Sequence, residues 1–157
     1  MSNARLAPDF LFEASWEVCN KVGGIHTVIS TKAQTVTRKF GDRYILIGPD
    51  LSHEGTNPEF EEDQTLLKAW RQAVYSEGLR IRIGRWRVVG RPIAVLVDYT
   101  SLFPKKDDIL KFLWETYHVD SISGQWDYIE PVLFGHAAGQ VIASYVENFC
   151  ASTDKVV

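Results

Sequence analysis

The chain has few of the residues that build a covalent or metal-held framework. It contains two cysteines in 157 residues, and Cys19 and Cys150 are too few and too far apart for a disulfide network or a zinc cluster. Both fit a reducing compartment, where an isolated cysteine is usually a small buried residue. We therefore expect two buried free thiols and a cytoplasmic protein.

Long apolar runs and an excess of basic charge are also missing. No apolar run approaches the roughly 20 residues that span a bilayer, and the amino terminus does not have the layout of a signal peptide. The 17 basic and 20 acidic residues leave a net charge of −3, so no basic field favours nucleic acid or an anionic membrane. We expect neither as a partner.

Several catalytic motifs are absent as well. There is no G-x-G-x-x-G, no P-loop and no G-x-S-x-G, which disfavours a dinucleotide fingerprint, a Walker-type site and the usual hydrolase signal. His26 and His136 fall on expected helices without a second ligand at metal spacing. The acids from Glu59 to Asp63 read as a solvated run and make no spaced glycosidase pair. No metal and no cofactor are expected.

What is present is enough for one compact domain, because 45% of the residues are apolar. Periodicity and turn signals predict alternating strands and helices. The expected elements are strands at Phe10–Ala14, Tyr44–Gly48, Leu79–Gly84 and Ile93–Val97, and helices at Ile25–Phe40, Thr65–Ser76, Asp107–Tyr117 and Ile129–Cys150. Residues 48–64 and 118–128 are expected to be loops.

The fold class follows from that order. The first strand, helix and strand make a βαβ unit with parallel pairing, and the turn around Gly90 predicts a hairpin. We expect a three-layer α/β domain over residues 9–157, with a mostly parallel sheet and one antiparallel hairpin. Residues 1–8 read as a flexible terminus or the scar of an expression tag. Lys155–Val157 resembles the start of another parallel strand, so we expect a longer protein.

The segment that joins the first strand to the first helix is the best candidate site. It ends in Lys21-Val22-Gly23-Gly24. The first amides of a helix have no partner within the helix, and the helix dipole favours an anion there. Glycines let phosphate groups approach the backbone, and Lys21 adds a positive charge. This pattern favours diphosphate binding, although a tight turn with a solvated lysine would read the same way.

Other residues are weaker candidates. Asp98-Tyr99 ends a predicted strand at the rim where ligands of open α/β sheets collect. Trp86 and Trp126 could be platforms for stacking sugars, but packing is the commoner role of an isolated tryptophan.

A longer run of residues around the glycine loop resembles the amino-terminal signature of the eukaryotic-type glycogen synthases. The run Phe12-Glu-Ala-Ser-Trp-Glu-Val-Cys-Asn-Lys-Val-Gly-Gly-Ile25 is followed in the same order by further similar segments. These are Phe40–Tyr44, Leu46–Pro49, Gly84–Trp86 and Val132–Gly135. In the bacterial and plant branch the loop reads Lys-Thr-Gly-Gly, whereas Val22 favours the eukaryotic branch.

The resemblance implies the amino-terminal, Rossmann-like domain of a GT-B glycosyltransferase. Such an enzyme transfers glucose, with retention, from a nucleoside diphosphate to the non-reducing end of an α-1,4-glucan. Lys21, Gly23 and Gly24 would meet the donor diphosphate, and Glu17 would support the loop or contact the ligand. The donor would be UDP-glucose rather than ADP-glucose by family branch.

The resemblance also implies that other parts of such a site lie beyond Val157, in a second domain of the same protein. No catalytic residue is then expected within the present chain, and the isolated chain should transfer no glucose. A stand-alone nucleotide- or glucan-binding module without catalysis is the alternative, and a starch-synthase relative with a different nucleotide is another.

Overall fold

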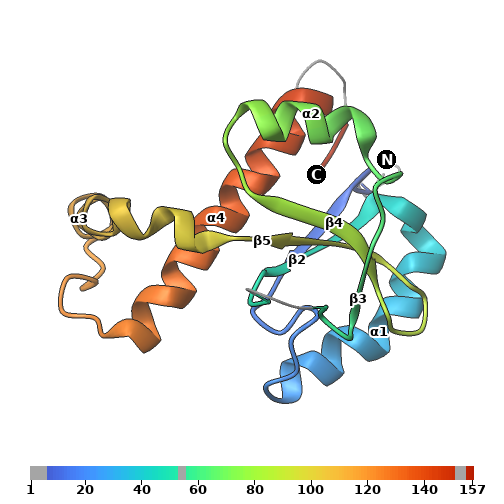
Figure 1. Ribbon diagram of the computed structural model, residues 1–157, viewed down its shortest axis with the longest axis horizontal. Coiled ribbons are helices and arrows are strands. Elements are labelled where there is room, and N and C mark those ends of the chain that lie inside the picture. Colours follow the sequence, from blue (N-terminus) through green and yellow to red (C-terminus); the bar gives the residue numbers. More distant parts are fainter. Residues whose placement is uncertain (1–6, 53–55, 151–154) are drawn as a thin grey trace, which may run out of the picture.

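The computed structural model describes residues 7–52, 56–150 and 155–157. Within these residues, five strands form one sheet in the order β1-β2-β5-β4-β3. They are β1 (Leu11–Ala14), β2 (Tyr44–Pro49), β3 (Phe60–Glu62), β4 (Ile81–Trp86) and β5 (Ile93–Val97). β1, β2 and β5 run parallel, whereas β4 pairs antiparallel with both β5 and β3. β4 is therefore the reversed strand of a mixed sheet, and its antiparallel pairing with β5 is the hairpin that the sequence predicted (Figure 1).

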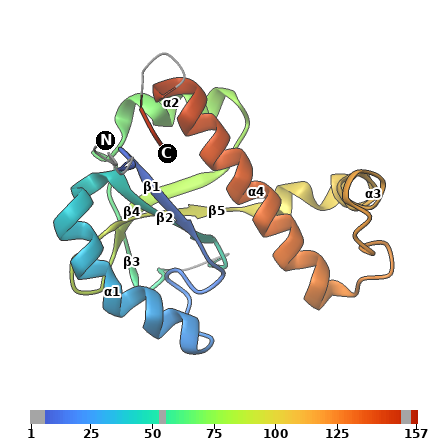
Figure 2. The ribbon, with the colours of Figure 1, turned by 180° about the vertical axis from the view of Figure 1, so that it is seen from behind.

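Helices cover both faces of this sheet. They are α1 (Gly24–Phe40), α2 (Lys68–Ser76), α3 (Lys106–Tyr117) and α4 (Trp126–Phe149), with 3₁₀ turns at Gly41–Arg43 and Tyr99–Lys105. α1 lies on one face, and α2 and α4 lie on the other (Figures 1 and 2). α3 extends away from the sheet, beyond the end of β5. The expected α/β architecture with helices on both sides is confirmed.

The two central parallel strands form the core because every residue of β2 and β5 is buried. Alternate side chains enter two apolar clusters. Ile45, Ile47 and Val95 lie in the cluster beneath α2 and α4, whereas Leu46 and Leu96 lie in the cluster beneath α1. A strand buried on both faces reads as a continuous apolar run, and this explains why the sequence predicted β2 and β5 well.

β3 is the strand that the sequence analysis missed. Residues 48–64 were expected to be a loop, but Phe60–Glu62 pairs with β4. Its acidic side chains meet arginines: Glu61 Oε2 lies 3.0 Å from Arg91 Nη2, and Glu62 Oε2 lies 3.1 Å from Arg82 Nε. The acidic run is therefore partnered, and the interpretation as a merely solvated run is wrong.

The apolar stripe expected along α1 is wrong in its first turn. Ile25 and Val28 are 56% and 60% exposed, whereas the first turn buries His26. The stripe holds further along the helix, where Ile29 and Ala33 are buried. On α3, Trp114 and Tyr117 are exposed, although the periodicity placed them on the buried side.

Helix starts also differ from the expectation. The residue before α3 is Lys105, and no side chain caps this helix, so the expected aspartate cap at Asp107 or Asp108 is wrong. α4 begins at Trp126, three residues before the expected Ile129. Both differences lie at helix ends, where sequence patterns are least decisive.

The two ends of the described chain lie together. The amides of Asp9 and Phe10 donate to Val156 O over 2.7 and 3.2 Å. Residues 155–157 are extended at this point but do not form a strand. The expected turn at 151–154 and most of the expected flexible segment 1–8 lie outside the described residues. None of the described helices is long and apolar enough to cross a membrane.

Candidate functional site

The loop between β1 and α1 lies at the carboxyl ends of the parallel strands, as the sequence predicted. It leaves β1 with the Ser15 amide donating to Ile47 O of β2 over 3.0 Å. It then crosses β2 so closely that a Cβ on Gly48 would lie 2.5 Å from Val18 O. Glycine at position 48 is therefore required by the close approach of the two backbones. This contact fixes the height of the loop above the sheet.

Glu17 closes the loop from inside. Its Oε2 accepts from the Gly23 amide over 2.6 Å and from the His26 amide over 3.1 Å. These amides, that of Gly23 first, lower the pKa of Glu17 from its ordinary value of 4.5, against the opposing effect of burial. The carboxylate thus occupies part of the helix start that could attract an anion. These two hydrogen bonds are what a role of Glu17 in supporting the loop requires.

The second half of the loop, from Lys21 to Gly24, is open to solvent. Lys21, Gly23 and Gly24 are exposed, and Lys21 makes no hydrogen bond or ion pair with any other described residue. A Cβ on Gly24 would meet nothing within 4 Å, and one on Gly23 would come no closer than 3.6 Å to Glu17. Neither glycine is therefore required by packing within the described chain.

The amides of the first helical turn divide into two groups. Those of Gly23 and His26 are bound to Glu17, whereas within the described residues the amides of Gly24 and Ile25 have no protein acceptor. A ligand anion therefore finds Gly24, Ile25 and the Lys21 ammonium group, but not the Gly23 amide.

A cavity of about 310 Å³ opens beside the loop. Cys19, Asn20 and Lys21 line one side, and Leu51, Ser52 and residues 56–59 line the other. A larger hollow of about 720 Å³ lies on the β4–β5 hairpin, lined by Glu61 and residues 87–91. We take the smaller cavity as the candidate site because it adjoins the strand ends, where ligands of α/β sheets bind.

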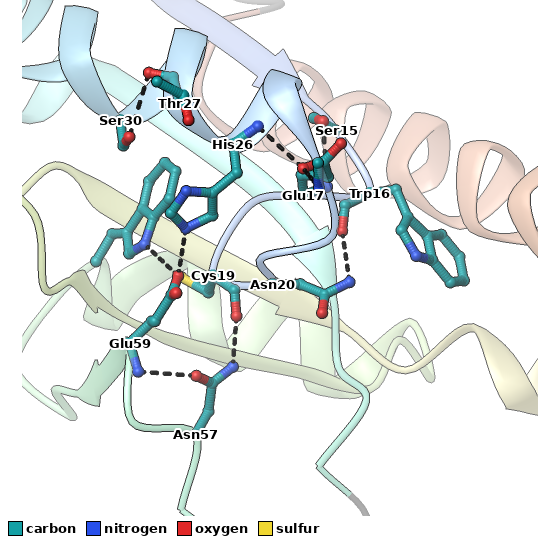
Figure 3. Close-up of polar contacts among 12 residues, drawn as sticks. Ser15, Trp16, Glu17, Cys19, Asn20, His26, Thr27, Ser30, Asn57 and Glu59 are labelled. Carbon is teal, nitrogen blue, oxygen red and sulfur yellow. Dashed lines mark hydrogen bonds and ion pairs between the residues drawn. The ribbon is translucent and has the colours of Figure 1, made fainter.

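A polar cluster behind the loop was not anticipated from the sequence. His26 Nε2 lies 2.8 Å from Glu59 Oε2, and Trp86 Nε1 donates to the same oxygen over 3.1 Å. Figure 3 shows His26 between Glu17 and Glu59. Trp86 is fully buried, so it cannot be a sugar platform. Trp126 is 52% exposed and keeps that interpretation.

The other candidate residues, Asp98 and Tyr99, have structural roles. Asp98 accepts from the amide of Thr100 over 3.0 Å and caps the 3₁₀ turn. Tyr99 is buried, and burial with the nearby Glu130 charge raises its pKa to about 12. In the part of the chain that the structure describes, no three His, Cys, Asp or Glu side chains gather as a metal site would require. Cys19 and Cys150 are both buried, as expected, and neither forms a disulfide within the described residues.

Comparison with known proteins identifies the family. The family described as glycogen synthase matches residues 13–157. The liver glycogen (starch) synthase of Mus musculus is 45% identical over 162 aligned residues, which cover 94% of this chain and 23% of that protein. The glycogen (starch) synthase of Neurospora crassa is 34% identical over 139 residues, which cover 87% of this chain and 20% of that protein.

The resemblance inferred from separate motifs is thus confirmed along almost the whole chain. The chain spans about a fifth of the length of these curated relatives. On the family match from Glu13 to Val157, the chain belongs to the glycogen synthase family.

Proposed function

We propose that the chain is the amino-terminal, Rossmann-like domain of a GT-B glycosyltransferase, spanning residues 9–157. The full-length protein transfers glucose from a nucleoside diphosphate to the non-reducing end of an α-1,4-glucan, with retention of configuration. UDP-glucose is the donor rather than ADP-glucose. Support comes from the family match and from relatives whose names describe glycogen (starch) synthases. The two buried cysteines, neither of them in a disulfide within the described residues, fit a cytoplasmic enzyme.

The observation that carries this proposal is the open glycine loop at the strand ends. Lys21 has no partner within the described chain, and the space at Gly24 where a Cβ would stand is empty. A diphosphate placed there would receive the Gly24 and Ile25 amides and the Lys21 charge. Glu17 holds the loop and does not contact the donor, because its Oε2 already binds two amides.

One wall of a donor site is not sufficient for transfer. A reacting site must exclude water and hold both substrates in register, and it must place groups against the charge that develops on the sugar and the leaving diphosphate. We propose that a second domain of the full-length protein supplies that wall and those groups. The chain of 157 residues alone then binds the donor weakly and transfers no glucose.

Incorporation of labelled glucose into glycogen tests the reaction. The full-length protein should transfer from UDP-glucose, and UDP should compete better than ADP. The isolated chain should give no signal above a no-protein control. Binding of nucleotide or glucan by the full-length protein without any transfer would instead favour a binding module. Better competition by ADP would favour the starch-synthase branch.

A further inference from the structure

The buried His26 and the partly buried Glu59 form a pair that the proposed donor contacts do not use. They come from α1 and from the segment just before β3, 33 residues apart. The imidazole of His26 is edge-on to the Trp86 indole, with ring centroids 5.3 Å apart and planes at 82°. A carboxylate oxygen only accepts hydrogen bonds, so His26 Nε2 donates to Glu59 Oε2 (Figure 3). Trp86 Nε1 donates to the same oxygen.

The same segment holds the loop at a second point. Asn57 Nδ2 donates to Cys19 O over 2.9 Å, and Asn57 Oδ1 accepts from the Glu59 amide over 2.9 Å. The Glu59 charge also reaches this part of the loop, since burial, with a contribution from Glu59, raises the pKa of the Cys19 thiol. Residues 57–59 therefore hold the loop at Cys19 on one side and at His26 on the other.

The exposed residues of the loop lie between these two attachments. Within the described residues, the Lys21 side chain makes no hydrogen bond or ion pair, and Gly24 has no side chain. The positions of both residues therefore depend on the backbone from Cys19 to His26. Glu17 fixes the middle of this stretch, because one of its oxygens binds the amides of both Gly23 and His26. His26 thus joins two carboxylates, Glu17 through its amide and Glu59 through its ring.

We propose that Glu59 is a positioning residue for the nucleotide-sugar donor. It acts through His26 and Asn57 to hold the loop so that Lys21 and the open amides meet the diphosphate. This inference rests on the proposed function and adds a residue that lies outside the glycine motif. A purely structural Glu59 would contribute to folding stability alone, whereas a positioning Glu59 also sets donor affinity.

The test compares Glu59→Ala with a control from the same segment in the full-length protein. Glu61→Ala is the control, because Glu61 is exposed and pairs with Arg87 and Arg91 on the hairpin. Glu59→Ala should raise the donor KM by about tenfold, as expected for the loss of hydrogen bonds to a charged group. The KM for glucan should stay unchanged, and Glu61→Ala should leave both constants unchanged.

A double-mutant cycle separates positioning from folding. If Glu59 acts partly through the placement of Lys21, then the loss of UDP affinity in the double variant Lys21→Ala with Glu59→Ala should be smaller than the sum of the two single losses. Additive losses would overturn the proposal. A folded Glu59→Ala protein with unchanged donor KM would overturn it too, whatever its melting temperature.

If Glu59→Ala does not fold, Asn57→Ala is the second variant. It removes the attachment at Cys19 and the acceptor of the Glu59 amide but keeps the Glu59 carboxylate. It should still raise the donor KM, and an unchanged KM would contradict the inference. A wild-type protein that does not bind UDP overturns the proposed function. If the wild-type protein binds UDP and the Glu59 and Asn57 variants bind it equally well, only the positioning role is overturned.

Discussion

The two faces of the sheet are held by different forces. Beneath α2 and α4 the contacts are mostly apolar, with Leu133, Val141 and Trp70 buried to 1% exposure or less. Beneath α1 the apolar cluster is smaller, and three carboxylates bind neighbouring groups. Glu13 binds Lys32 and Tyr44, while Glu17 and Glu59 share His26. Apolar packing is not directional, whereas hydrogen bonds to carboxylates fix orientation.

This difference explains where a site can be built. The proposed donor site requires a loop with a fixed backbone, and the α1 side provides directional contacts that fix it. The α2/α4 side supplies most of the buried apolar area and hence the stability of the domain. Substitutions on the two sides of the sheet should therefore have effects that differ in size and in kind.

The largest effect is expected in the apolar layer. Leu133 of α4 is fully buried, and Leu133→Ala should lower the free energy of unfolding by about 2 to 5 kcal/mol, because it leaves a cavity. Urea unfolding of the 157-residue chain measures this. A loss below about 1 kcal/mol would be no larger than the effect of an ordinary substitution. It would contradict the view that apolar packing beneath α2 and α4 stabilises the domain.

A smaller effect is expected from a single polar contact on the α1 side. The fully buried Tyr44 donates to Glu13 Oε2 over 2.6 Å, and Tyr44→Phe should cost about 1.5 to 3 kcal/mol, as for a hydrogen bond to a charged group. Tyr75→Phe is the matched control, because Tyr75 is 88% exposed. Equal stability of the two variants would show that the ion pair with Lys32 is enough to stabilise the Glu13 carboxylate without the Tyr44 hydroxyl.

Acid should weaken the loop before it weakens the apolar layer. The pKa of Glu17 is lowered below 4.5 in the folded protein, so its contribution is present above pH 4.5 and disappears as the pH falls through the folded value. The stability difference between wild type and Glu17→Gln should shrink below pH 4.5. Thermal melts from pH 3 to pH 7 would check this, and a difference independent of pH would refute it.

The smallest effect tests the corrected orientation of α1. Val28 is 60% exposed, so Val28→Ser should change the free energy of unfolding by less than about 0.5 kcal/mol. If the apolar stripe expected from the sequence were right, Val28 would be a core residue. Val28→Ser would then lower the free energy of unfolding several times more. Urea unfolding beside Leu133→Ala decides between the two orientations.

The sequence predicted what depends on neighbours along the chain. Strands β2 and β5, helix α4 and the loop before α1 all have local signatures. The sequence analysis missed β3 because a strand of three residues, two of them charged, is too short to show a period. Its Glu62 side chain pairs with Arg82 of β4, which lies 20 residues further along the chain. The burial of His26 escaped for the same reason, since its partners Glu59 and Trp86 lie far along the chain. Glu17 at the helix start was predicted only as a possible support of the loop.

The central claim is that Lys21 meets the donor diphosphate, and UDP binding to the full-length protein tests it most directly. Lys21→Ala should weaken UDP binding by about ten- to hundredfold, as for the loss of a charged hydrogen bond. It should leave uridine binding unchanged, because uridine carries no phosphate. Lys111→Ala, an exposed lysine on α3, is the matched control and should change neither. Calorimetry that gives equal UDP affinity for wild type and a folded Lys21→Ala would contradict the account.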